Sequence, residues 1–263
     1  MKKIIIGLVL TLTILVNSDR AVWGAPRQLA VLLYHHVIPA SDVQSYWKGG
    51  FVIPQESFAA QMEYLCKNNY HAVTSAELRS FLYDKKPLPD RSVMITFDDG
   101  YMSNYMFAYP ILKQYGFNAV VFAIAGNMQT QEQDYHPDKL DMLSWLQVAA
   151  SSDVFEYGSH TYGLHNIVNG KTGFVTAPLD QARADLLLSQ KRIGGNKLFA
   201  YPSGQYTDQL TKMVKNDGVD LAFTIHTGYV SQNSDPLLLD RVTVYSGYDI
   251  QTFESIVACK YQF

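Results

Sequence analysis

The chain has 263 residues, of which 48% are hydrophobic and 17% are charged, and its formal net charge is −3. This composition excludes an intrinsically disordered chain. It also argues against a nucleic-acid-binding protein, because the chain has neither the net positive charge nor the basic runs that contact phosphates. The length fits one large domain, and a single α/β barrel is of this size.

The first segment of the chain is typical of a secretory signal peptide. Lys2 and Lys3 precede an apolar run over 4–16, and a small residue, Gly24, precedes the expected cleavage site. The run is shorter than the roughly 20 apolar residues that span a membrane, so we expect no stable span in the mature form. We assign 1–24 to a signal peptide and 25–263 to one folded domain. The domain is then secreted, periplasmic or on the cell surface, and an uncleaved membrane anchor is the alternative.

Beyond this segment, expected strands alternate with expected helices along the whole chain. The strands are expected at 28–37, 71–73, 92–97, 118–125, 154–159, 198–201, 221–225 and 241–245. The helices are expected at 57–69, 74–84, 101–115, 140–150, 179–193, 207–216 and 250–260. This alternation predicts an α/β fold with a parallel sheet, and seven or eight such units in one domain favour a barrel. Irregular loops are expected at 39–54 and 166–177, where they could line a binding site.

The expected strand over 92–97 ends in two adjacent carboxylates, Asp98 and Asp99, followed by Gly100. Two neighbouring like charges repel each other, so they need a cation or a shared proton to be tolerated. Sites in α/β proteins form at the carboxyl ends of strands, which is where this pair lies. The same three residues also fit an ordinary turn.

A second polar group, His160 and His165, directly follows the expected strand over 154–159. Either histidine alone is more typical of a surface or core residue. Two imidazoles and one carboxylate, however, make a common open metal site, with positions left for water and substrate. Cys66 and Cys259 are too few for a zinc–thiolate site, and they could form one disulfide or remain buried free thiols.

The segments TFDDG at 96–100 and SHTYGLH at 159–165 resemble the first two motifs of the polysaccharide deacetylase family. This family is also called NodB-homology or carbohydrate esterase family 4, and the resemblance extends from about residue 30 onward. It implies a distorted β/α barrel in which Asp98 is the general base. It also implies that Asp99, His160 and His165 bind a divalent metal. Zinc is preferred, and Co²⁺, Ni²⁺ and Fe²⁺ stay open.

The chain departs from the family pattern at the third motif, which usually reads Arg-x-Pro-Tyr. Here 199–204 reads FAYPSG, so Ala200 stands at the arginine position and Ser203 at the tyrosine position. Arg241 could supply the lost cation from another strand, or it could form a surface ion pair. A backbone N–H near Ser203 is expected to bind the oxyanion. The side chains expected to line the pocket wall are those of Tyr162, Tyr201 and Trp145.

The family's last motif supplies a catalytic histidine near the C-terminus, and no histidine follows Arg241 here. Instead, Leu33-Tyr34-His35 resembles a circularly permuted branch that includes the poly-N-acetylglucosamine deacetylases of biofilm matrix. This resemblance implies that His35 is the catalytic acid. His36 is a weaker alternative, because neighbouring strand residues point to opposite faces. His226 is a further candidate.

The resemblance thus implies a secreted metal-dependent hydrolase that acts on linear amide C–N bonds. It would remove N-acetyl groups from a β-linked N-acetylglucosamine polymer, with poly-N-acetylglucosamine favoured, and release acetate. Peptidoglycan and chitin oligomers are alternative substrates, and the polymer is expected to bind to the barrel's own loops. A non-haem iron oxygenase and a non-catalytic carbohydrate-binding protein are the alternatives from other classes.

Overall fold

The structure, a computed structural model, describes residues 28–47 and 49–263, so the predicted signal peptide over 1–24 lies outside the described residues. Its main sheet has eight strands in the order β11-β10-β7-β6-β5-β1-β12, with β4 beside β5. These strands are β1 (Ala30–Tyr34), β4 (His71–Ala72), β5 (Ser92–Asp99), β6 (Ala119–Ala123), β7 (Phe155–Ser159), β10 (Leu198–Ala200), β11 (Leu221–Phe223) and β12 (Val242–Thr243). All of them pair in parallel, as the alternating pattern predicted.

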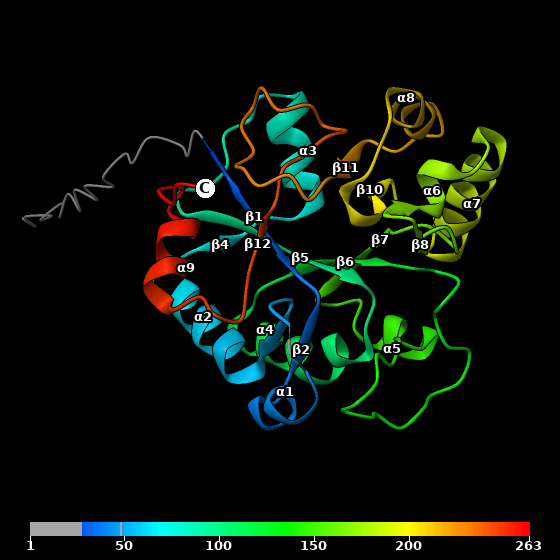
Figure 1. Ribbon diagram of the computed structural model, residues 1–263. Helices are drawn as coiled ribbons and strands as arrows, with labels where there is room; N and C mark the ends of the chain where they lie inside the picture. The colour runs from blue at the N-terminus through cyan, green and yellow to red at the C-terminus, as the bar shows by residue number, and fades with distance from the viewer. Residues whose placement is uncertain (1–27, 48) are drawn as a thin grey trace, which may run out of the picture.

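Helices surround this sheet (Figure 1). They are α2 (Gln55–Lys67), α3 (Ser75–Tyr83), α4 (Tyr109–Tyr115) with the preceding π-helical turn η1 (Asn104–Ala108), α5 (Trp145–Ala150), α7 (Leu179–Arg192), α8 (Asp208–Asn216) and α9 (Ile250–Val257). A capping box begins α3, where the Thr74 side chain accepts a hydrogen bond from the Glu77 backbone. Gly116 ends α4 in the left-handed conformation at φ 70°, which a residue without a Cβ adopts at little cost.

The sheet curls into a distorted barrel because one segment joins its two edges, at β11 and at β1. Leu239 pairs in parallel with Phe223 of β11, and the Arg241 N–H donates to the His226 carbonyl at 3.0 Å. The chain then continues into β12, where Val242 and Thr243 pair with β1. This closure confirms the barrel prediction.

The alternation of side chains along β5 places a polar side chain inside the barrel. Val93, Ile95 and Phe97 pack in the apolar cluster that includes residues of α2, α4 and α9. Met94 lies in a second cluster with residues of β1, β6, β10 and β11. Since side chains alternate along a strand, Asp98 follows Met94 on the inner face.

Four expected segments differ from the structure, and the first is the strand over 28–37, which is divided at His35 into β1 and β2 (His36–Ile38). Residues 140–144 are not helical, because Ser144 caps α5 and starts that helix at Trp145. The segment over 39–54 holds α1 (Ala40–Tyr46) and β3 (Val52–Pro54), which pairs with β2 (His36–Ile38). The segment over 166–177 holds the hairpin of β8 (Ile167–Val168) and β9 (Lys171–Thr172), followed by α6 (Gly173–Thr176).

Both cysteines are free thiols, Cys66 exposed and Cys259 partly buried. A disulfide is therefore absent, and the expectation of a buried thiol was wrong for Cys66, whose side chain lies on the outer face of α2. Within 28–47 and 49–263, none of the helices has the length and apolar character needed to cross a membrane.

Candidate active site

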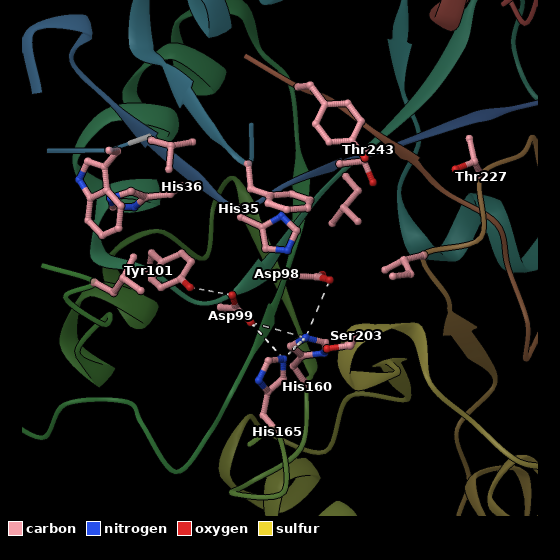
Figure 2. A pocket seen from close by; sticks show the side chains of 17 residues that line it. His35, His36, Asp98, Asp99, Tyr101, His160, His165, Ser203, Thr227 and Thr243 are labelled. Carbon is pink, nitrogen blue, oxygen red and sulfur yellow. Dashed lines mark hydrogen bonds and ion pairs between the residues drawn. The ribbon is translucent and has the colours of Figure 1, made fainter. Parts of the chain in front are cut away.

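A cavity of about 460 Å³ opens at the carboxyl ends of the barrel strands (Figure 2). It contains both predicted motifs, because β5 and β7 end at the same edge of the sheet. The residues that line it are Leu33, His35, His36, Trp47, Phe51, Val52, Asp98, Asp99, Tyr101, Leu140, His160, His165, Ser203, Ile225, Thr227, Thr243 and Tyr245.

Asp99, His160 and His165 converge in this cavity, with one ligand atom of each within 4.8 Å of the others. The Nε2 atoms of His160 and His165 are 3.1 Å apart. They lie 3.6 and 3.4 Å from Asp99 Oδ1, respectively. The structure therefore brings together the three residues that the sequence analysis assigned to a metal.

The chemistry of these three side chains fits a divalent cation. The Nδ1–H of His160 donates to the Ala200 carbonyl at 2.8 Å, which leaves the Nε2 lone pair free to face the other ligands. Burial lowers the pKa of His160, so its imidazole is neutral, as a metal ligand must be. Asp99 Oδ1 is buried without a hydrogen-bond partner, and such an orphaned oxygen is satisfied by a bound cation. The Tyr101 hydroxyl donates to the other oxygen, Asp99 Oδ2, at 2.8 Å and fixes the carboxylate.

Two residues in the motif loops, Asp99 and Thr161, have backbone conformations that are costly for side chains with a Cβ. Asp99 has φ 71° and Thr161, next to His160, has φ 73°. The left-handed region costs a non-glycine residue roughly 1–2 kcal/mol, and a β-branched threonine is rare there. Contacts with the surrounding fold keep both turns in this unfavourable backbone conformation. Such strained residues are typical of functional sites.

Asp98 forms a buried ion pair with Arg241. The Nη1 and Nη2 atoms of Arg241 donate to the two oxygens of Asp98 at 2.7 Å each, and its Nε donates to the Thr224 carbonyl at 2.8 Å. Arg241 is 0% exposed, so the alternative of a surface ion pair is wrong. Burial alone would raise the pKa of Asp98, but the charge of Arg241 and the Arg241 hydrogen bonds hold that pKa well below its usual range.

His35 and His36 both line the cavity, because β1 ends at Tyr34 and the chain turns at His35 before β2. Neighbouring side chains point to opposite faces only within a continuous strand, so this break lets both histidines face the cavity. His35 lies above Asp98 in Figure 2, and burial lowers the pKa of its imidazole while the Asp98 and Asp99 charges oppose that shift. His36 Nδ1 is 2.7 Å from Ser103 Oγ, and its ring packs edge-on against Trp47 and Tyr101.

The other expected residues divide between the cavity and the rest of the fold. Ser203 lines the cavity with φ 50°. Tyr201 is buried in the core between Phe199 and Tyr206, so it forms no pocket wall. Tyr162 and Trp145 are not among the lining residues, and Trp145 instead packs against the apolar core. His226 is exposed outside the cavity, and its ring packs edge-on against Tyr206.

Two residues that position the site, and one that lines it, were not predicted from the sequence. Tyr101 directly follows the Asp-Asp-Gly motif, and this proximity could have identified it. Asp185 of α7 accepts hydrogen bonds from the backbone N–H groups of Tyr162 and Gly163 at 2.7 and 2.8 Å. It thereby holds the loop between the two histidines, and no local pattern marks it. Trp47, in the segment expected to be irregular, lines the cavity in place of the predicted Trp145.

Comparison with known proteins identifies the family. The model of the polysaccharide deacetylase family matches residues 85–222. The poly-beta-1,6-N-acetyl-D-glucosamine N-deacetylase of Staphylococcus aureus (strain MSSA476) is 32% identical over 204 residues, which cover 74% of this chain and 68% of that protein.

Two solved structures share the fold. The structure of IcaB from Ammonifex degensii has a TM-score of 0.72 and 27% identity, covering 89% of this chain and 97% of that one. The Streptococcus pyogenes deacetylase PplD in complex with acetate has a TM-score of 0.76 and 20% identity, covering 88% and 99%. Together with the match to the family model, these similarities show that the chain belongs to the polysaccharide deacetylase family.

Proposed function

We propose that this chain is a secreted, metal-dependent N-deacetylase of a β-linked N-acetylglucosamine polymer, with poly-β-1,6-N-acetylglucosamine as the favoured substrate. One observation carries the proposal: Asp99, His160 and His165 converge beside the Arg241-bound Asp98 in a single cavity. The name of the Staphylococcus aureus relative favours this polymer over peptidoglycan or chitin oligomers.

The cation would be held by Asp99 Oδ1 and by the Nε2 atoms of His160 and His165. Two imidazoles and a carboxylate suit Zn²⁺ with an open position for substrate. When bound, the ion would supply Lewis acidity toward the acetyl carbonyl oxygen. The Ala200 carbonyl and the Tyr101 hydroxyl keep two of the three ligands oriented.

Asp98 would act as the general base. Its depressed pKa keeps it ionised across the neutral range, and the two Arg241 hydrogen bonds fix its oxygens. It would take a proton from the water that attacks the acetyl carbon. Because Asp98 holds that proton weakly, the proton would pass to the neutral His35 imidazole and then to the departing nitrogen. The C–N bond breaks, and the products are acetate and an amino sugar.

Ser203 would contribute to stabilising the oxyanion. The residue lies in the left-handed region at the cavity wall, in the position that the sequence analysis matched to the family's motif tyrosine. A backbone N–H in a fixed, strained turn is preorganised and needs no rearrangement as charge develops on the carbonyl oxygen.

Acetate release from oligomers of β-1,6-N-acetylglucosamine, chitin and peptidoglycan tests the function, with and without a chelator. We expect release from the β-1,6 oligomers, its loss with chelator and its recovery with Zn²⁺. Asp98→Asn should abolish turnover while metal stays bound, and His160→Ala should lose both. Full activity of Asp98→Asn would show that another residue is the base, and chelator-resistant release would contradict metal dependence.

The secreted location is proposed from the signal-peptide pattern over 1–24. Cleavage after Gly24 would leave Ala25 as the first residue of the mature protein. N-terminal sequencing of the exported protein checks this site, and a mature chain that still begins at Met1 would favour the uncleaved anchor.

A further inference from the structure

Two exposed aromatic rings, those of Phe51 and Tyr245, stand together at the rim of the cavity. Phe51 is 54% exposed and Tyr245 is 39% exposed, and both line the cavity. Their ring centroids are 5.7 Å apart, with 49° between the ring planes. Exposed aromatic side chains that adjoin a candidate active site indicate a binding surface rather than core packing.

The local backbone is shaped to hold this pair. The Ser246 N–H donates to the Gly50 carbonyl at 3.1 Å and ties the two rim segments together. A Cβ at Gly50 would lie 3.0 Å from Cδ1 of the Tyr245 ring, so a residue without a side chain lets the ring approach. Tyr248 packs edge-on behind Tyr245, with centroids 5.4 Å apart. Tertiary contacts therefore position the two rings.

The pair also reaches the candidate catalytic acid. The Phe51 ring meets the His35 imidazole edge-on, with centroids 5.4 Å apart. A ligand that lies on Phe51 is thus placed beside His35 and, through it, beside Asp98. Apart from Asp98 and Asp99, the cavity-lining residues that the structure describes include no aspartate, glutamate, lysine or arginine. Away from these two carboxylates, the described part of the wall therefore offers no counter-charge to a charged sugar.

We propose that Phe51 and Tyr245 form an aromatic platform that binds the apolar face of a neutral pyranose ring next to the reacting unit. This inference rests on the proposed function and adds to it that the protein recognises chains of uncharged, N-acetylated sugars rather than single units. The axial C–H groups of a β-linked N-acetylglucosamine ring form a flat apolar face, which an aromatic ring covers without a charged partner. Continuity of the platform with the cavity favours a sugar of the same polymer over another ligand.

Binding can be measured apart from catalysis. Chelator-treated protein, which cannot turn over the substrate, is titrated calorimetrically with β-1,6-N-acetylglucosamine oligomers of two and of six units. We expect the hexamer to bind more tightly, and Phe51→Ala and Tyr245→Ala each to weaken hexamer binding by about tenfold. Tyr245→Phe should keep the wild-type hexamer affinity, because the ring and not the hydroxyl makes the contact.

Tyr46→Ala is the matched control. Tyr46 lies in the same segment as Phe51 and is equally exposed at 54%, but it does not line the cavity. Its removal should leave hexamer affinity unchanged. Unchanged affinity in both platform variants, or an equal loss in Tyr46→Ala, would overturn the platform.

Replacing the hexamer's acetamides by free ammonium groups should weaken binding, and equal affinity for that cationic hexamer would contradict the neutral-sugar specificity. Acetate release by the untreated protein decides the proposed function separately.

Discussion

Arg241 shows how one residue sets the properties of the site. Its guanidinium contacts both oxygens of Asp98, the Thr96 hydroxyl and the Thr224 carbonyl, and its Cζ lies 5.6 Å from the centroid of the Phe122 ring. All of its polar interactions are therefore within the protein. A buried pair of this kind is costly to break, because the remaining charge is left without water or a partner.

Arg241→Ala should lower the free energy of unfolding by about 3–5 kcal/mol and strongly reduce kcat/KM, since Asp98 loses its counter-charge. Urea denaturation and acetate release measure the two effects. Arg79→Ala is the control, because Arg79 also binds an aspartate, Asp220, but is 35% exposed. That variant should lose about 1 kcal/mol or less. Equal losses of unfolding free energy in the two variants would show that burial of the Arg241–Asp98 pair adds nothing to stability.

His36 should make stability depend on pH. Burial lowers its pKa from 6.5 to about 4, so the unfolded chain binds the proton first as the pH falls. The stability contributed by the neutral imidazole is complete above pH 6.5 and is lost as the pH falls toward 4. Between pH 7 and pH 5 this contribution should decrease by about 2 kcal/mol. His36→Gln should remove that part of the pH dependence in urea denaturation, and identical pH profiles would refute the assignment.

At the scale of elements, α7 supports the candidate metal ligands at a distance. Its Asp185 carboxylate accepts two backbone hydrogen bonds from the turn that joins His160 to His165. Burial raises the pKa of Asp185, while the N–H groups of Tyr162 and Gly163 act in the opposite direction. The position of the histidine loop therefore depends on a helix that contributes no ligand.

Asp185→Ala should weaken zinc binding by about tenfold or more, because the loop loses the acceptor that orders it. Competition with a chromogenic chelator measures the affinity. Asp180→Ala changes an exposed aspartate of the same helix and should have no effect on zinc. If Asp185→Ala binds zinc as tightly as Asp180→Ala does, the loop is held by other contacts.

At the scale of the whole molecule, the site depends on closure of the barrel. The segment over 239–243 pairs with β11 at one end and with β1 at the other, and this places Arg241 opposite Asp98. The candidate ligands likewise come from the ends of two different strands, β5 and β7. A cation bound there would link them and favour the folded state over the unfolded chain.

Zinc should therefore stabilise the whole fold. At about 100 times its Kd, a ligand specific for the folded state adds about 2.7 kcal/mol, which raises the Tm of a chain of this size by roughly 5–10 °C. Thermal unfolding of chelated and zinc-loaded protein measures the shift. His165→Ala should abolish it, and an unchanged zinc response in that variant would exclude His165 as a ligand.

The sequence by itself determined the features that depend on short stretches of chain. The run of apolar residues in β5, the capping box at Thr74 and the glycine stop at Gly116 each follow from neighbouring residues, and the structure has all three. The motif pairs Asp98–Asp99 and His160–His165 are local as well. They could be assigned to one edge of the sheet because parallel strands share a carboxyl end.

Only the tertiary structure decided which distant residues complete the site. Arg241 and Asp98 are 143 residues apart, and no periodicity in the sequence relates them. The Phe51–Tyr245 platform and the Asp185 support depend in the same way on long-range packing. Tyr201 and Trp145 were expected in the pocket wall, but Tyr201 is buried in the core and Trp145 packs against it. The reason is physical: a local pattern sets the face and period of an element, whereas the pairing of distant segments depends on the free energy of the whole packed chain.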